Sequence, residues 1–378
     1  MNPKNKLLLF ILLLWQVSFG QDKNLMLVSP AGEDAVIAYF QQFPDSPDGT
    51  KLVFTIFKEN DKMDIVLKDL KTQEMFTLNT VNGIERHVGA HPIWIDNATL
   101  AYASDKDNII YIHNIYTGNV EQYKGSQISD YSIVNHKLLF KSKGKENEDK
   151  QIFILDLNTK MVIPFLDIND VLPFKDAIGT NIPLEGWNFD HPLWSPDATK
   201  LMFTIKAKEK TKSGEKKKTE EHLFFANADG SNISYFGRRP MHEQWWDNKT
   251  FYGFRAAKGQ QHHMDIYDLK GNVVQKDVAG HGNHGTVSPD KEWIVADSWY
   301  QSDPINVFLY KQGSTNFTKV LFQQPRKVNG KDFWDVHSHI HPAFSRDGKR
   351  VYFNGMAKDG LSKVWCYDLT DIIDKKAK

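Results

Sequence analysis

The sequence has a single cysteine, Cys366, and no net charge, because 47 Lys and Arg residues balance 47 Asp and Glu residues. One cysteine excludes an internal disulfide, and a zero balance gives no general attraction for nucleic acid. After the first 20 residues, no apolar run is long enough to cross a bilayer. The sequence also lacks the Gly-x-Ser-x-Gly elbow of many hydrolases and the glycine-rich loop that holds nucleotide phosphates.

The amino-terminal segment has the pattern of a secretory signal peptide. Lys4 and Lys6 give it positive charge, residues 7–17 are apolar, and residues 18–20 form a small-residue cleavage pattern. We therefore expect residues 1–20 to be removed and residues 21–378 to form one exported domain, with no membrane insertion after cleavage. A bacterial periplasm fits this expectation, although export alone does not choose among compartments.

A short repeated phrase runs through the rest of the chain. An apolar stretch leads to Ser-Pro-Asp-Gly or a related turn, as at residues 46–49, and a second alternating strand follows. One register position precedes each turn, and the seven positions are Gln42, His91, Ser129, His191, His242, His284 and His341. They lie about 50 residues apart on average, which is the length of a four-stranded propeller blade. The repeat predicts an all-β protein, a seven-bladed β-propeller.

Three further expectations concern the organisation of this ring. Residues 160–185 are the least regular stretch, and we expect a long insertion there. The basic run over residues 206–218 alternates Lys with Glu and Ser, which favours a solvated hairpin loop. Residues 35–40 are our candidate for a strand that joins the last blade and closes the ring. We also expect Trp94 and Trp194, next to register positions, to pack between blades.

An alternating histidine triplet is the sharpest chemical signal. His337, His339 and His341 would share one face of a strand, and His284 holds the register position of the preceding blade. Several such imidazoles together suit a divalent metal ion. The alternative is that register histidines are structural and hydrogen-bond to neighbouring blades. We favour that alternative for His91 and His191, but it explains the triplet poorly.

Several stretches together resemble a known family. They are Asp190-His-Pro-Leu-Trp, Asn227-Ala-Asp-Gly-Ser-Asn, His242-Glu-Gln-Trp, His284 ahead of Ser288-Pro-Asp, and His339-Ile-His341-Pro-Ala-Phe. The repeat as a whole resembles the TolB-type, or WD40-like, propeller repeat, and these stretches resemble oligogalacturonate lyase, a seven-bladed polysaccharide lyase. The resemblance implies an acidic oligosaccharide as substrate and His242 as the base. It also implies that His284, His339 and His341 bind a divalent metal, Mn²⁺ in preference to Zn²⁺ or Ca²⁺.

The sequence departs from the family at the residues around this core. The family's metal-binding glutamine aligns with Val336, so His337 becomes the candidate fourth ligand. The family's substrate-binding arginine aligns with His222, and Arg238 or Arg239 could replace its charge. The remaining substrate-binding candidates are His191 and Gln42. The family's amino-terminal His-Arg pair has no evident counterpart.

The implied chemistry is β-elimination of a 4-linked uronide. The proton at C5 leaves from beside a carboxylate, so a divalent cation and a cationic side chain are needed to neutralise that charge. A neutral histidine can accept the proton. The rival hypothesis is a non-catalytic TolB-like propeller that acts as a periplasmic binding or scaffold module. A hydrolase with paired carboxylates is disfavoured, because no acidic pairs occupy the register positions.

Overall fold

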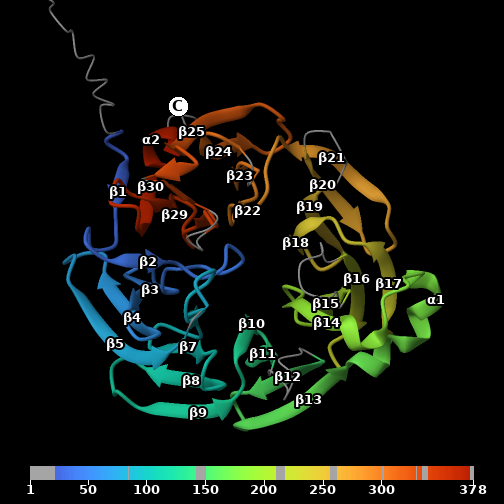
Figure 1. The fold of residues 1–378 in the computed structure, drawn as a ribbon. Coiled ribbons are helices and arrows are strands. Elements are labelled where there is room, and N and C mark those ends of the chain that lie inside the picture. Colours follow the sequence, from blue (N-terminus) through green and yellow to red (C-terminus); the bar gives the residue numbers. More distant parts are fainter. Residues whose placement is uncertain are drawn as a thin grey trace, which may run out of the picture.

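The computed structural model describes residues 22–374 except 84, 142–149, 210–217, 256–261, 300–301, 329 and 334–338. The expected signal peptide, the candidate ligand His337 and most of the basic hairpin loop lie outside the described residues. The described chain forms seven four-stranded antiparallel sheets arranged as a ring, as Figure 1 shows. The prediction of an all-β, seven-bladed propeller is therefore confirmed.

Each blade has four strands that follow one another from the propeller axis outward. Blades 1 to 3 are β2 (Asp34–Val36), β3 (Lys51–Lys58), β4 (Lys62–Asp69), β5 (Met75–Asn82); β6 (Ile93–Trp94), β7 (Thr99–Ser104), β8 (Ile109–Asn114), β9 (Val120–Lys124); and β10 (Gln127–Ser132), β11 (Lys137–Lys141), β12 (Gln151–Asp156), β13 (Met161–Asp167). Blades 4 and 5 are β14 (Trp187–Trp194), β15 (Lys200–Lys208), β16 (Thr219–Asn227), β17 (Ser234–Arg238); and β18 (Met241–Trp245), β19 (Thr250–Phe254), β20 (Met264–Asp268), β21 (Val273–Ala279). Blades 6 and 7 are β22 (Gly285–Val287), β23 (Trp293–Asp297), β24 (Ile305–Lys311), β25 (Phe317–Gln324); and β28 (Ala343–Phe344), β29 (Arg350–Met356), β30 (Ser362–Asp368), β1 (Leu25–Leu27).

The repeated Ser-Pro-Asp turn has the same hydrogen bonds wherever it occurs. In blade 1 the Ser46 hydroxyl donates to Asp48 at 2.6 Å and accepts the backbone N–H of Lys51 at 3.0 Å. The same pair of bonds recurs at Ser195, Ser288 and Ser345. Serine and aspartate are thus required because their side chains satisfy the backbone of a tight turn. The turn fixes the start of the second strand, so in blades 2 to 7 the register position falls in the inner strand or within two residues of its start; in blade 1 Gln42 lies in the loop that follows β2.

The ring closes through the amino-terminal strand β1. Its residues Leu25, Met26 and Leu27 pair with Tyr367, Cys366 and Trp365 of β30, which makes β1 the outermost strand of blade 7. The expectation that residues 35–40 close the ring is therefore wrong. Ala35 and Val36 pair with β3 inside blade 1, where both side chains are fully buried.

Residues 37–44, which we call the axial loop, leave β2 and run toward the propeller axis. The Gln41 side chain donates to the carbonyl of Glu243 at 3.0 Å, and that of Gln42 donates to the carbonyl of Ser129 at 3.2 Å. Tyr39 and Phe40 are buried among the rings of His191, His242, His284 and His341. With the bond that Trp94 of blade 2 makes to Pro44, the loop contacts all six other blades and blocks the axis at this level.

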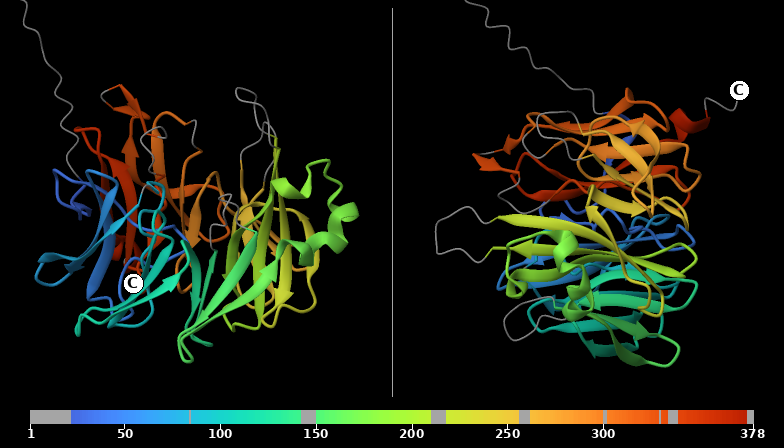
Figure 2. Two further views of the ribbon diagram at one scale, coloured as in Figure 1. Left: turned by 60° about the horizontal axis from the view of Figure 1, so that its bottom comes forward. Right: turned by 90° about the vertical axis from the view of Figure 1, so that its right-hand side faces the viewer.

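The elements outside the repeat lie at the rim. The insertion consists of η1 (Ile168–Phe174), α1 (Lys175–Ile178) and η2 (Leu184–Gly186), beside blade 4 at the edge of the ring (Figures 1 and 2). The expected insertion is confirmed, except that its first residues belong to β13. A small hairpin of β26 (Lys327–Val328) and β27 (Lys331–Asp332) precedes blade 7, and α2 (Thr370–Ile373) follows it. Among the described helices, none has the length and apolar character needed to span a membrane.

The core lies between neighbouring blades. Trp94 and Trp194 are 1% and 5% exposed, which confirms the expected packing role of both side chains. The Trp94 indole also donates to the carbonyl of Pro44 at 3.1 Å, so it links blade 2 to blade 1. Because each blade is covered on both faces, the inner strands are held firmly, and their side chains have defined positions around the axis.

Candidate functional site

Four of the five register histidines have an unusual backbone conformation. The φ angles of His91, His191, His242 and His341 lie between 44° and 56°, in the left-handed region. A non-glycine residue there costs roughly 1–2 kcal/mol, and such residues concentrate at functional sites. At His191 and His242 the strand pairing is also shifted by a β-bulge. A bulge changes the direction of a side chain relative to its strand. The same backbone conformation at the register position therefore directs several imidazoles toward the axis.

Three imidazoles meet near the axis. One ligand atom from each of His87, His339 and His341 lies within 4.8 Å of the others. His341 is fully buried, and neither of its ring nitrogens has a hydrogen-bond partner among the described residues. A buried polar atom without a partner is rare and costly, so it indicates a missing partner such as a bound ion. Donors of this kind and number suit a divalent transition metal.

His284 completes the group, and we call His87, His284, His339 and His341 the histidine cluster. The Nε2 atom of His284 lies 3.4 Å from Nδ1 of His339, and its ring centroid lies 4.7 Å from that of His341. Asp297 accepts a hydrogen bond from Nδ1 of His284 at 2.8 Å and one from its backbone N–H at 2.7 Å. A carboxylate in this position fixes the tautomer and leaves Nε2 as the ligand atom.

The structure brings together His284, His339 and His341, as expected, and adds His87. The expected strand is not there, however: His339 and His341 precede β28, and His341 has a φ of 46°. His87 lies outside the repeat register, in the segment before β6, so sequence reasoning missed it. Its one sequence signal is the four-residue spacing to His91, which alone is weak. Gly89 anchors this segment: its φ is +61°, and a Cβ there would lie 2.5 Å from the Thr55 hydroxyl. Only glycine lets the segment approach β3 so closely.

Burial keeps three members of the cluster, His87, His339 and His341, uncharged. Burial and repulsion from neighbouring imidazoles lower the pKa of His87 to about 3. The same two causes hold the pKa values of His339 and His341 well below the usual value of histidine. Neutral imidazoles keep the lone pairs that a metal ion requires. The cluster is therefore ready to bind a cation at neutral pH.

His242 lies beside the cluster with its ring centroid 4.2 Å from that of His284. Its Nδ1 donates to the carbonyl of Asn283 at 2.8 Å, so Nε2 carries the lone pair. Burial lowers the pKa of His242 well below its usual value, and His284 and Arg239 add repulsion. A neutral histidine with an oriented lone pair is able to accept a proton.

The remaining candidates fall into two groups. His191, Gln42 and Arg239 surround the axis near the cluster: the Tyr39 ring stacks on His191 at 5.4 Å, and Arg239 Nη1 lies 3.2 Å from His191 Nδ1. His222 and Arg238 face each other on β16 and β17, the two outer strands of blade 4. There His222 bonds to the Tyr235 hydroxyl at 3.0 Å. The structure therefore does not bring His222 and Arg238 to the histidine cluster.

Arg239 belongs to a row of alternating charges that crosses blades 3, 4 and 5. The row, which we call the ion chain, consists of Lys141, Asp190, Lys206, Glu221, Arg239 and Glu243. Each cation contacts at least one carboxylate; Lys206 lies 2.7 Å from Asp190 and 3.2 Å from Glu221. Its three positive and three negative charges cancel. Arg239 is thus close to the site, but its charge is already balanced by Glu221 and Glu243.

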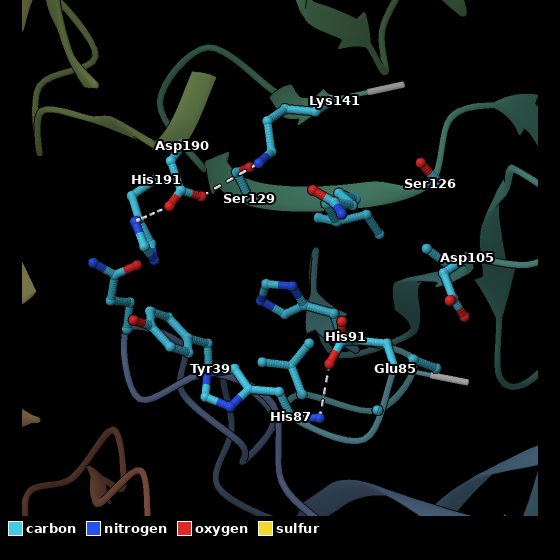
Figure 3. Close-up of a pocket in the computed structure, with 17 residues that line it drawn as sticks. Tyr39, Glu85, His87, His91, Asp105, Ser126, Ser129, Lys141, Asp190 and His191 are labelled. Carbon is cyan, nitrogen blue, oxygen red and sulfur yellow. Dashed lines mark hydrogen bonds and ion pairs between the residues drawn. The ribbon is translucent and has the colours of Figure 1, made fainter. Parts of the chain in front are cut away.

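A cavity of about 210 Å³ adjoins the histidine cluster, and we call it the side cavity. Its lining includes Tyr39, Glu85, His87, His91, Lys141 and Asp190, which come from blades 1 to 4 and the segments between them. Figure 3 shows the imidazole of His91 directed into this space and Lys141 paired with Asp190 at its wall. His87 belongs to both the cavity and the cluster, so the two are adjacent.

The role of Asp297 can be tested by Asp297→Asn. The variant keeps the shape of the side chain, but it removes the charge and places an amide beside two N–H donors of His284. We expect metal affinity to fall by about 10–100-fold, the usual effect of losing such an outer partner. Competition with a chromophoric chelator measures it.

The matched control is Glu292→Gln, an exposed carboxylate in the same blade that pairs with Lys311. Its metal affinity should equal that of the unaltered protein. Equal affinity in Asp297→Asn would show that the carboxylate does not support a metal ligand.

Comparisons with known proteins agree with the fold. No protein-family model matches the sequence, and no curated protein matches it either. Among solved structures, an oligogalacturonate lyase in complex with manganese has a TM-score of 0.65 at 16% identity, over 91% of this chain and 92% of that chain. An oligogalacturonate lyase from Vibrio parahaemolyticus has a TM-score of 0.64 at 17% identity, over 91% and 93%. The propeller domain of the Trilobed protease from Pyrococcus furiosus has a TM-score of 0.56 at 11% identity, over 89% and 96%. At these identities the likeness shows the seven-bladed fold, which this chain shares with the oligogalacturonate lyases.

Proposed function

We propose that this protein is a metal-assisted lyase that cleaves short uronate-containing saccharides by β-elimination. The observation that carries the proposal is the juxtaposition of His242 with the histidine cluster, at 4.2 Å between the rings of His242 and His284. A proton acceptor and a cation site side by side are what removal of a proton next to a carboxylate requires. The fold shared with two oligogalacturonate lyases supports the proposal.

The residues of the cluster fit a metal ion. His341 has two buried nitrogens without partners among the described residues, and Asp297 already orients His284 as a ligand. A divalent ion held by His87, His284, His339 and His341 would neutralise the uronate carboxylate and stabilise the negative charge that develops at C5. The manganese in one related structure makes Mn²⁺ the first ion to test.

The protein's own groups carry the proton transfer. His242 accepts the C5 proton at Nε2, while the bond from Nδ1 to the Asn283 carbonyl holds the ring in place and stabilises the cation that forms. The electron pair of the C5–H bond becomes the C4–C5 double bond as the C4–O bond breaks, and the departing oxygen takes up a proton from water. Tyr39 and Phe40 of the axial loop exclude water from one side of the site, which strengthens the electrostatic interactions within it. Because Arg239 is balanced by two carboxylates, neutralisation of the substrate falls mainly on the cluster.

The rival function, a non-catalytic binding or scaffold propeller, requires no metal and no oriented proton acceptor. The four left-handed register residues weigh against it, because backbone strain at several repeats persists only where the surrounding structure maintains it. A pure scaffold has no need of such residues around one axis.

A screen of uronate oligosaccharides tests the proposal. We expect an unsaturated product, seen by its ultraviolet absorbance, in the presence of Mn²⁺, and its loss after chelation and dialysis. Restoring the ion should restore the rate. Failure of every uronide with the metal-loaded protein would contradict the proposed function and favour the binding module.

A further inference from the structure

The side cavity carries more negative than positive charge. Its lining contains three carboxylates, Glu85, Asp105 and Asp190, and Lys141 is the one lysine or arginine among its lining residues, all of which lie in the described part of the chain. The Lys141 ammonium already has partners within the protein: it lies 3.4 Å from Asp190 and donates to the Phe189 carbonyl at 3.1 Å. A carboxylate entering this space would meet like charges, and such encounters exclude wrong ligands.

The same lining suits hydroxyl groups, which both donate and accept hydrogen bonds. The carboxylates of Glu85 and Asp105 can accept from them. His91 points into the cavity, and its buried Nε2 has no hydrogen-bond partner among the described residues. The Tyr39 side chain also lines the cavity, with its ring stacked on His191 at an interplanar angle of 24°.

The size of the cavity limits what it can hold. At about 210 Å³ it is smaller than the roughly 300–1,000 Å³ of pockets for drug-sized ligands. One sugar ring is therefore a better match than a longer segment. His87 joins this space to the histidine cluster, so a ring held here would be the neighbour of the unit held at the metal.

We propose that the side cavity is a subsite for a neutral sugar unit. This inference rests on the proposed function and narrows it: the substrate is a saccharide in which the reacting uronate is linked to a neutral sugar, and a run of uronates is disfavoured. Glu85 and Asp105 are the specificity-determining residues. His91 contributes a hydrogen bond to a sugar hydroxyl.

The test compares two short oligosaccharides of equal length with the metal-loaded protein. One consists only of uronates, and the other alternates uronate with a neutral hexose. We expect kcat/KM to be at least tenfold higher for the alternating saccharide. In the double variant Glu85→Gln with Asp105→Asn, which keeps side-chain shape but removes two charges, the preference should shift at least tenfold toward the all-uronate saccharide.

Glu74→Gln, an exposed carboxylate next to β5, is the control and should leave the preference unchanged. A wild-type protein that cleaves the all-uronate saccharide equally well, or a double variant with an unchanged preference, would overturn the inference.

If neither saccharide is cleaved, the proposed function is wrong. The subsite is then tested separately, by measuring the binding of a neutral hexose methyl glycoside with calorimetry. Binding that weakens in the double variant supports the subsite, and absence of binding overturns it.

Discussion

His242→Ala lowers the rate of β-elimination on the order of 10²–10⁴-fold, the range that a positioned proton acceptor contributes. The side chain is neutral because burial holds its pKa down, and its Nε2 is free because Nδ1 donates to Asn283. Water could replace the imidazole only without its orientation, since Phe40 and His284 pack against the ring. Initial rates of unsaturated product at saturating uronide measure the loss, which should appear in kcat.

Measuring metal affinity distinguishes a role of His242 as proton acceptor from a role in building the metal site. His242→Ala should retain the metal affinity of the unaltered protein, because His242 is not a member of the cluster. His136→Ala, at an exposed turn next to β11, is the matched histidine control and should retain full activity. An active His242→Ala variant would remove His242 from the mechanism. Loss of both metal and activity would assign it to the cluster instead.

His341→Ala has the second large effect, on metal binding and activity together. Its two buried nitrogens are at the centre of the cluster, within 4.5 to 5.4 Å of the His87, His284 and His339 rings by their centroids. Loss of an inner ligand should reduce affinity by more than the about 10–100-fold expected for an outer partner. Activity should fall on the order of 10²–10³-fold, as when an electrostatic contributor to catalysis is lost. Metal analysis after dialysis and the uronide assay measure the two effects.

Because His341 is fully buried, the alanine variant leaves a cavity and its folding must be checked by thermal unfolding. His87→Ala is the second variant: the side chain is partly exposed and lies in a segment between blades, so its removal costs less stability. It should show the same loss of metal. Two folded variants with unchanged metal content would contradict the assignment of the cluster.

The repeat made most of the fold predictable. Seven related turns, spaced about 50 residues apart on average, define the blades, and at four of them serine and aspartate side chains form the turn. Most register residues then fall in or next to inner strands, which is why His284 and His341 could be grouped from the sequence, with His339 two residues before His341. Periodicity carries this information because equivalent residues in a ring face a common axis.

Non-repeating segments escaped this reasoning. His87 lies between blades and reaches the cluster only through the close contact of Gly89 with Thr55, which no spacing rule anticipates. Residues 35–40 are apolar and are our candidate for a strand of the last blade, yet the chain turns to the axis after Val36, because β2 is paired with β3 and β1 has taken the open edge of blade 7. The neutral balance of the ion chain likewise depends on contacts among three blades, and no single stretch of sequence reveals it.

The axial loop also sets how a saccharide can travel. The loop contacts five blades through Tyr39, Phe40, Gln41 and Gln42 and closes the axis, so the site is open on one side of the ring. A ligand must arrive and depart by one opening, and a long polymer cannot be threaded from face to face. Under the proposed function, the protein therefore trims chain ends and small fragments, and another enzyme must first cut the polymer internally to produce them.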